Sequence, residues 1–422
     1  MNIKISKFGK IKTANISVNG LTVIAGKNDT GKSTVGKAIY SVIKSITGFP
    51  QMYTQLIRTQ AIMDIFSLLF ELVRNHKGDS KDNNYALIEN MRGEMLNSII
   101  ASGGKVTESL YNRVDSFMNI INSYVENVSI DTKMRENLDH ISDLLKENVS
   151  DNDKFLKISS AVFSSNFLRT YNNSVTNESS ELSFSLGSDE LASLKFENNE
   201  LSSGNLDVMK RANSFRDATL IESPLYLEDT HTSDIPFAQD LKKKINQAKD
   251  LFLLKNENTE ILHQIDLILE KSRFNYDEND KIFTYTVDKD AKPLKIINIA
   301  SGAKSLGLLY AFLKTGILLK DSLLILDEPE NHLHPEWQIK FAKILVLMVQ
   351  NDFNVLLTSH SPVFIHALMK YSKDLISSKS KINFYLSEKI PNTNYSTFKN
   401  VNSTINDIFE NLNAPNDVLY ME

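Results

Sequence analysis

Apolar and polar residues alternate in short stretches over positions 2–26 of the chain, NIKISKFGKIKTANISVNGLTVIAG. The alternation is interrupted at Gly9 and at Asn19-Gly20. A period of two is typical of strands, and Asn-Gly is a common turn between the two strands of a hairpin. The segment therefore predicts strands joined by a hairpin. The last of them, LTVIA, runs into Gly26 before a helix that begins near Lys32.

Between about residues 40 and 180 the apolar positions recur at intervals of three and four instead. The intervals are clearest at 106–128 and 134–145, where the apolar residues are Val106, Leu110, Val114, Phe117, Ile121, Tyr124, Val128, Met134, Leu138, Ile141 and Leu145. Such spacing gives each helix one apolar stripe that another helix can cover. The pattern predicts a helical insertion over residues 41–180. It favours compact packed helices, and a short coiled-coil arm is the alternative.

Beyond residue 180 the pattern returns to strands and then alternates between helices and strands. The expected elements are strands within 181–206 and 218–228, a helical stretch over 237–273, strands at 282–287 and 294–298, a helix over 305–319, the strand SLLILDE, a helix over 335–350, the strand FNVLLTS and a helix from 362. This alternation is typical of a parallel sheet covered by helices. We therefore expect one α/β domain made of residues 1–40 and 181–422, interrupted by the insertion.

Composition narrows the class of protein. The 422 residues are 41% hydrophobic and 23% charged, as in an ordinary globular protein. The net charge of −5 gives no general affinity for nucleic acid, although a local basic groove stays open. The chain has no cysteine, which excludes disulfides, thiol catalysis and cysteine-bound zinc and fits a reducing cytosol.

Two observations bear on location. The N-terminus has the alternation of a strand and lacks the apolar core of a signal peptide. The most apolar run, 62–73, contains Asp64 and Glu71. It is also shorter than the roughly 18–20 residues of a membrane span. We expect a cytoplasmic protein without a membrane partner.

The segment GKNDTGKST, residues 26–34, carries the strongest chemical signal. It matches G-x-x-x-x-G-K-[ST] between a predicted strand and a predicted helix, the context that a phosphate-binding P-loop requires. Its backbone N–H groups and the helix N-terminus favour phosphate. Lys32 is expected to reach the β- and γ-phosphates, and Ser33 to bind Mg²⁺. The predicted nucleotide-binding residues are Gly26, Lys27, Asn28, Asp29, Thr30, Gly31, Lys32, Ser33 and Thr34.

A second strand supplies the carboxylates that a P-loop needs. SLLILDE is an apolar run that ends in Asp327 and Glu328. In this pairing Asp327 is expected to support Mg²⁺, and Glu328 to activate or position the attacking water. The histidines that follow, His332 and His334, point about 200° apart in a helix and to opposite faces in a strand, which disfavours one shared zinc ion. Pro335 predicts the start of a helix.

Two further segments narrow the class of nucleotide-binding protein. One is IASGAKSLGLL (299–309), a Ser-Gly turn that opens a helix, and the other is LLTSHSP (356–362), a strand that ends at His360. With P-loop, Ser-Gly signature, Asp-Glu strand and switch histidine in this order, the chain resembles the ATP-binding-cassette (ABC) ATPases of the SMC/RecF-like and OLD-like branch. The signature reads ASGAK where transporters have LSGGQ, and together with ENHLHP this is similar to the OLD type. The resemblance leaves the insertion uncovered.

The resemblance implies a fold and an assembly. The fold would be an ABC-ATPase head: α/β, with a mixed or parallel sheet that carries the P-loop and an N-terminal antiparallel β-subdomain. Two heads would pair as a homodimer, or within a higher oligomer, with ATP and Mg²⁺ between them. Ser301 and Gly302 of one subunit, with Lys304 adding charge, would face the γ-phosphate on the P-loop of the other. His360 would sense or hold that phosphate, and the ENHLH segment would cross to the partner subunit.

The resemblance also implies a biological setting. OLD-type proteins often continue into a Toprim nuclease, but only 62 residues follow His360, too few for that domain. We therefore expect an Mg²⁺-dependent ATPase that cuts nothing itself. It would regulate a separately encoded effector, expected to be a nuclease, in a bacterial anti-phage defence or DNA-repair complex. The alternative is a RecF/SMC-like repair ATPase that binds DNA directly. The sequence does not separate Gln51 from Gln239 as a Q-loop residue, and it assigns Glu222 no role.

Overall fold

The protein is described here from a computed structural model. The structure describes residues 1–52, 149–172, 178–222, 236–373 and 382–421, with gaps of one or two residues between 256 and 300, and only scattered residues between 62 and 119. The chain divides into two compact units, Met1–Thr47 with Ser159–Glu422, and Gly48–Ile158. The sequence analysis set the corresponding limits at 40 and 180. The helices expected at 106–128 and 134–145 fall largely outside the described residues.

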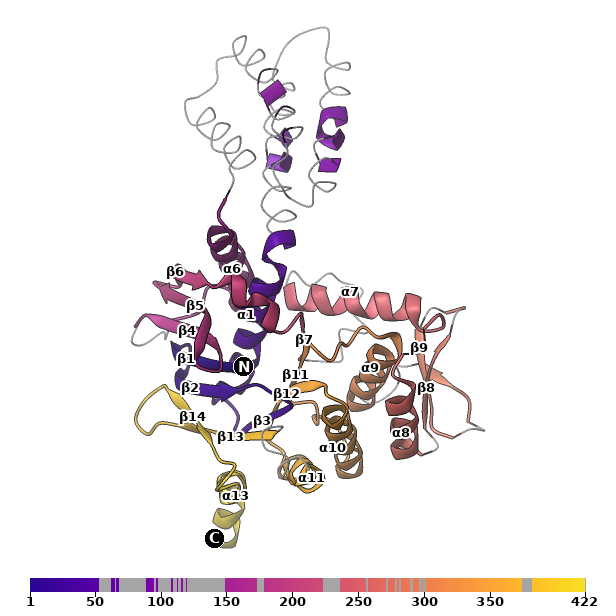
Figure 1. Cartoon of the computed structure of the whole chain (residues 1–422). Coiled ribbons are helices and arrows are strands. Elements are labelled where there is room, and N and C mark those ends of the chain that lie inside the picture. The colour runs from indigo at the N-terminus through magenta and orange to yellow at the C-terminus, as the bar shows by residue number, and fades with distance from the viewer. Residues whose placement is uncertain are drawn as a thin grey trace. The chain divides into compact units, whose positions relative to one another are not determined.

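Eleven strands of the first unit form one mixed sheet in the order β6-β5-β4-β1-β2-β14-β13-β3-β12-β11-β7 (Figure 1). Their bounds are β1 Asn2–Phe8, β2 Ile11–Ser17, β3 Leu21–Gly26, β4 Ser180–Leu186, β5 Asp189–Glu197, β6 Glu200–Leu206, β7 Ala218–Ile221, β11 Leu323–Asp327, β12 Asn354–Ser359, β13 Ile382–Lys389 and β14 Ser396–Asn400. Strands β6 to β2 pair antiparallel, whereas β13, β3, β12, β11 and β7 pair parallel. This confirms the predicted α/β fold with an antiparallel N-terminal part.

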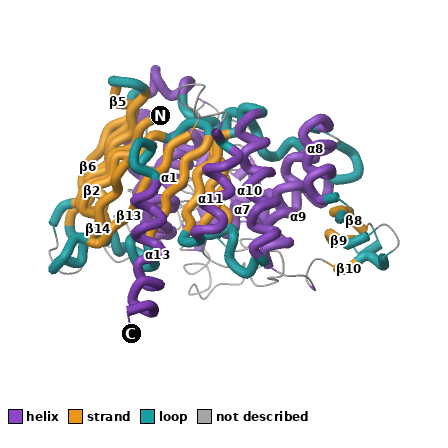
Figure 2. Tube along the Cα trace, turned by 90° about the horizontal axis from the view of Figure 1, so that it is seen from below, coloured by secondary structure: helices purple, strands orange, loops and turns teal. Residues whose placement is uncertain are grey.

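Helices pack against both the parallel and the antiparallel strands. Their bounds are α1 Lys32–Met52, α6 Asp151–Phe167, η2 Val208–Asn213, α7 Pro236–Leu251, α8 Thr259–Leu269, α9 Ser301–Thr315, α10 Pro335–Gln350, α11 Pro362–Tyr371 and α13 Asn406–Met421. Figure 2 shows α8, α9 and α10 together on the side of the parallel strands. Next to them lies a small antiparallel sheet of β8 Arg273–Asp277, β9 Ile282–Thr286 and β10 Leu294–Lys295. Within the described part of the chain, no helix combines the length and the apolarity needed to cross a membrane.

The parallel strands are buried on both faces. On one face, Leu324 and Leu326 of β11 join a hydrophobic core with residues of α8, α9, α10 and α11. On the other face, Gly36 of α1 approaches Ile325 so closely that a Cβ on the glycine would lie 3.2 Å from the isoleucine side chain. Side chains alternate along a strand, so one apolar run contacts both helical layers. This two-sided packing fixes the P-loop helix against β11.

One stretch departs from the predicted pattern. The helical stretch expected over 237–273 is two helices, α7 and α8, and β8 begins at Arg273. Helix α8 ends at Leu269, and its C-cap residue Glu270 has a left-handed φ of 60°. Phe274 then pairs with Tyr285 of β9 and their ring centroids are 5.0 Å apart. This pairing across the chain makes RFNYD a strand, and nothing local in the sequence reveals it.

An ion-pair cluster joins α1, α7 and the start of β7. Lys44 Nζ lies 2.5 Å from Asp217 Oδ1 and 3.0 Å from Asp240 Oδ2, and Lys244 Nζ lies 2.6 Å and 3.3 Å from the same two carboxylates. Lys244 also donates to the carbonyl oxygen of Ala218, at 3.0 Å. Burial raises the pKa of the Asp217 carboxyl, but the nearby charges of Lys244 and Lys44 lower it by more, so its pKa lies below the ordinary value. The cluster therefore stabilises the fold when Asp217 is ionised.

We predict that Asp217→Asn lowers the free energy of unfolding at pH 7 by about 2–3 kcal/mol, since it leaves two half-buried lysines short of a carboxylate. The contribution of Asp217 is fully present above its unfolded pKa of about 3.9 and is lost as the pH falls through the lower folded pKa. Urea unfolding from pH 7 to pH 3 should therefore show the two proteins converging.

The matched control is Asp321→Asn, whose partner Arg216 is exposed; it should change stability by less than about 1 kcal/mol. A difference between Asp217→Asn and the wild type that stays constant across this pH range would contradict the prediction.

Candidate functional site

The P-loop links β3 to α1, and strand β13 supports it from the side. Gly26 pairs in register with Ser387 of β13. Its φ is 153°, and a Cβ there would lie 2.1 Å from the Ser387 hydroxyl and 2.6 Å from the Ser387 carbonyl oxygen, so only glycine fits. Thr30 Oγ1 lies 2.6 Å from the same hydroxyl and 2.9 Å from the Lys27 carbonyl oxygen. The loop conformation is thus fixed by a strand from the other end of the chain.

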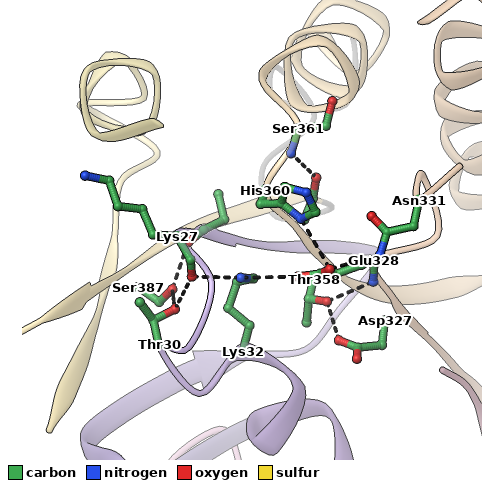
Figure 3. A network of polar contacts seen from close by, with 12 residues as sticks. Lys27, Thr30, Lys32, Asp327, Glu328, Asn331, Thr358, His360, Ser361 and Ser387 are labelled. Atoms are coloured by element: carbon green, nitrogen blue, oxygen red, sulfur yellow. Dashed lines mark hydrogen bonds and ion pairs between the residues drawn. The ribbon is translucent and has the colours of Figure 1, made fainter. Parts of the chain in front are cut away.

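Lys32 is the buried cation of this loop. Its side chain is 3% exposed, and Nζ donates to the Lys27 carbonyl oxygen at 2.9 Å. Nζ also lies 3.4 Å from Glu328 Oε1 (Figure 3). The contact joins the helix after β3 to the residue after β11. The P-loop and the Asp-Glu strand, which the sequence analysis paired, therefore meet in the structure.

A threonine of the intervening strand holds the two acidic residues. Thr358 of β12 pairs in register with Asp327, and its hydroxyl donates to Asp327 Oδ1 at 2.5 Å. The backbone N–H of Glu328 donates to the Thr358 hydroxyl at 3.0 Å and to the Thr358 carbonyl oxygen at 3.2 Å. Glu328 has a left-handed φ of 46°. That conformation costs a non-glycine residue about 1–2 kcal/mol, which these two hydrogen bonds offset.

Three groups surround the Glu328 carboxylate. Besides Lys32, Asn331 Nδ2 donates to Oε2 at 3.0 Å, and His360 Nδ1 lies 3.3 Å from Oε2 (Figure 3). Burial raises the pKa of Glu328, but the Asn331 hydrogen bond and the nearby His360 and Lys32 outweigh it, so its pKa lies below the ordinary value. Glu328 is therefore ionised at neutral pH. Sequence reasoning had not identified Thr358 or Asn331, which position it.

A cavity of about 790 Å³ lies over the P-loop. Its lining consists of Gly9, Lys10, Asn28, Asp29, Thr30, Gly31, Lys32, Ser33, Thr34, Phe167, Thr170, Asn172, Asp327, Glu328 and Asn394. The predicted binding residues 28–34 thus share one cavity with both acidic residues. Ser33 and Asp327, the predicted magnesium ligands, line the same space. Gly26 and Lys27 support the loop through the backbone contacts above.

The predicted signature residues open helix α9. Helix α9 begins at Ser301, and the described residues that line the cavity include none from this helix. The first turn of α9 has no acidic residue, and Lys304 in that turn is 5% exposed. A single chain therefore places Lys32, Asp327, Glu328 and His360 together.

The two histidines after Glu328 are exposed, and each has a place in the backbone of the turn before α10. His334 is the N-cap of α10: its Nδ1 accepts from the N–H of Glu336 at 3.4 Å, and Pro335 follows as the first helical residue. His332 has a left-handed φ of 63° in the turn. No group of three or more metal-ligating side chains suited to an ion occurs among the described residues. The helix start predicted at Pro335 is confirmed.

Comparisons with known proteins place the chain in a family. No curated protein matches it. Similar solved structures include the SMC head domain from Thermotoga maritima, with a TM-score of 0.40, 10% identity, and coverage of 95% of this chain and 98% of that one. Another is the Smc head domain with an extended coiled coil from Pyrococcus furiosus, bound to the C-terminal domain of ScpA, with a TM-score of 0.40, 10% identity, and coverage of 97% and 98%. A family model described as an AAA ATPase domain matches residues 1–365, and the chain therefore belongs to this family of ATPases.

Proposed function

We propose that the chain binds ATP with Mg²⁺ in the cavity over the P-loop and hydrolyses the bond between the β- and γ-phosphates. The observation that carries this proposal is the 3.4 Å contact between Lys32 Nζ and Glu328 Oε1. It places a phosphate-binding cation and an ionised carboxylate on one cavity. A P-loop with a nearby strand-end Asp and Glu is the arrangement that phosphoryl transfer to water requires.

Each residue has a proposed role that follows from its position. The N–H groups of residues 28–34 and Lys32 hold the phosphates. Ser33 and Asp327 fit Mg²⁺, because a hydroxyl and a carboxylate line the same cavity as the P-loop and hard oxygen ligands suit this ion. Bound there, Mg²⁺ would neutralise charge on the β- and γ-phosphate oxygens. Thr358 keeps Asp327 oriented through its hydroxyl hydrogen bond.

Glu328 orients the attacking water. Because its pKa is lowered, the carboxylate is ionised and can accept a hydrogen bond from water, but it is a weak base. In the ground state the main contribution of Glu328 is therefore to orient the water. The carboxylate takes up a proton from this water only as the water attacks the γ-phosphate. His360, 3.3 Å from the same carboxylate, would contact the γ-phosphate from the end of β12. Lys32 balances the charge on either the carboxylate or the phosphate.

We predict that Glu328→Gln lowers kcat for ATP hydrolysis about 100-fold or more while ATP still binds, because the amide keeps the size but loses the charge. Lys32→Ala should weaken ATP binding about 10- to 100-fold, since it removes a hydrogen bond to a charged phosphate. Steady-state phosphate release and equilibrium binding of a fluorescent ATP analogue measure the two effects.

The matched control is Glu336→Gln, an exposed carboxylate in the same segment that does not line the cavity. It should leave turnover and binding unchanged. Wild-type turnover in both Glu328→Gln and Lys32→Ala would contradict the assignment.

We propose that the active form is a head-to-head homodimer, or a higher oligomer built from such pairs, with ATP shared between subunits. The first turn of α9 has no acidic residue, and the exposed N–H groups at a helix start favour phosphate. Helix α9 does not line the cavity of its own chain within the described part. Ser301 and Gly302 would therefore serve the γ-phosphate of a second copy, and Lys304, buried in its own chain, would add positive potential behind them.

A mixing experiment tests the shared site. Ser301→Glu should abolish hydrolysis by placing a negative charge opposite the γ-phosphate, whereas a glutamate at a helix start is compatible with folding. In a mixed dimer of the two variants, the P-loop of the Ser301→Glu chain faces the intact signature of the Lys32→Ala chain, so this site has no substitution. The other site contains both substitutions. Equimolar mixing of the two inactive proteins should then recover up to about a quarter of wild-type ATPase activity. No recovery at any mixing ratio would contradict sharing between subunits.

We propose that this ATPase regulates a separately encoded effector, a nuclease, within a bacterial anti-phage or DNA-repair complex, as an OLD-like protein without nuclease activity of its own. The support is the similarity of ASGAK and ENHLHP to OLD-type sequences. In that setting the ATP-bound dimer holds or licenses the effector, and hydrolysis changes its state. Nucleic acid would then be contacted by the effector or by the complex.

Affinity purification from the native operon tests the setting. The amount of effector that co-purifies with tagged Glu328→Gln should differ at least about threefold from the amount that co-purifies with tagged Lys32→Ala. The reason is that Glu328→Gln stays bound to ATP, whereas Lys32→Ala does not bind it. Nuclease activity in the purified fraction, absent from the chain expressed alone, is the expected result. Direct binding of DNA by the isolated chain, falling steeply with salt, together with no co-purifying protein, would contradict effector regulation.

A further inference from the structure

A buried carboxylate lies two residues beyond Glu328 and has no part in the site as described so far. Glu330 is 2% exposed, in the turn between β11 and α10. Its Oε1 accepts from the Ser359 hydroxyl at 2.5 Å and from the backbone N–H of His360 at 3.2 Å. Its Oε2 is buried without a hydrogen-bond partner in the described part of the chain. The resemblance had placed this residue in the ENHLH segment that was expected to cross to the partner subunit.

Stability alone does not account for this residue. A buried carboxylate loses its hydration, and an oxygen without a hydrogen-bond partner adds a further cost. Consistently, burial raises the pKa of Glu330, and the Ser359 hydrogen bond only partly opposes it. An apolar side chain of similar size would avoid this cost. Unlike an apolar side chain, the carboxylate accepts a hydrogen bond from the backbone N–H of His360.

Helix α10, which follows this turn, holds the residue after His360 as well. The Ser361 hydroxyl donates to Gln338 Oε1 at 2.7 Å, and Gln338 Nε2 donates to the Leu333 carbonyl oxygen at 3.1 Å. Residues 359–361 are thus bound at three points by the segment that follows Glu328. Because His360 is the first residue after β12, its backbone would otherwise depend on the strand end alone.

We infer that Glu330 is a positioning residue that holds the backbone of His360 in place relative to the turn that carries Glu328. The inference rests on the proposed function. Through this link the imidazole and the Glu328 carboxylate, 3.3 Å apart, keep a common orientation toward the reacting phosphate. The exposed residues Asn331 and His332 belong to the same turn. A displacement of the turn by a second copy of the chain would therefore move His360 together with Glu328.

The decisive variants differ in whether they keep the acceptor. Glu330→Gln retains an oxygen that can accept from Ser359 and His360, and it should keep kcat within about threefold of wild type. Glu330→Ala removes the acceptor and should lower kcat about 10-fold or more. Its KM for ATP and its affinity for an ATP analogue should change less than about twofold, since the P-loop that binds the ground state is untouched.

A double-mutant cycle separates positioning from general destabilisation. If Glu330 acts through His360, adding Glu330→Ala to His360→Ala should lower kcat by less than about twofold further. Asp217→Asn, a destabilising change in the remote ion-pair cluster, should leave kcat per folded molecule unchanged. Glu330→Leu provides the second variant if Glu330→Ala does not fold: it should match Glu330→Ala in kcat.

The outcomes distinguish the two proposals. Wild-type turnover in Glu328→Gln and Lys32→Ala would remove the proposed function and this inference with it. Loss of turnover in those two variants, with normal kcat in Glu330→Ala or Glu330→Leu, would overturn the inference alone. So would additive effects of Glu330→Ala and His360→Ala, because they would show that the two residues act independently.

Discussion

The parallel pairing of β3, β12 and β11 determines where every polar group of the site lies. Strand β12 is the middle strand: Ser359 is opposite Ala25 of β3, and Thr358 is opposite Asp327 of β11. The carboxyl ends of all three strands therefore meet at one edge of the sheet. A shift of one residue in the β11–β12 pairing would turn Thr358 away from Asp327 and reverse the faces of the apolar run. Burial on both faces by α1 and by α9 to α11 prevents that shift.

Left-handed residues and a buried acid occur at this edge, and ion pairs elsewhere in the unit stabilise the fold. Glu328 and His332 have left-handed φ values, and Glu330 is a buried acid. These features occupy the turn between β11 and α10. The ion pairs of Lys44 lie twelve residues beyond Lys32, about 18 Å along α1 at the rise of a helix. Stabilising contacts remote from the chemistry allow the site to keep its costly geometry.

The sequence predicted the parts of the site that depend on local pattern. A P-loop between a strand and a helix, and an apolar strand that ends in Asp327 and Glu328, can be recognised because each motif is contiguous. The parallel part of the sheet followed from the alternation of helices and strands, whereas the antiparallel N-terminal part followed from the resemblance to ABC-ATPase heads. What the sequence could not provide depends on pairing between distant segments. Ser387 excludes a side chain at Gly26 only because β13 lies next to β3, and β8 is a strand only because Phe274 meets Tyr285.

The two glutamates of the DEPE turn differ because of their surroundings. Glu328 contacts Lys32 and accepts from Asn331, and its pKa is lowered, whereas burial raises the pKa of Glu330. Environments that push two nearby carboxyl groups apart in pKa give them separate tasks. Negative charge is then favoured at the cavity, where Lys32 can balance it, and disfavoured in the core of the turn. Glu330 needs no charge to accept from His360, because a neutral carboxyl retains an acceptor oxygen. Glu330 can therefore position His360 without competing with Glu328 for the positive charge of Lys32.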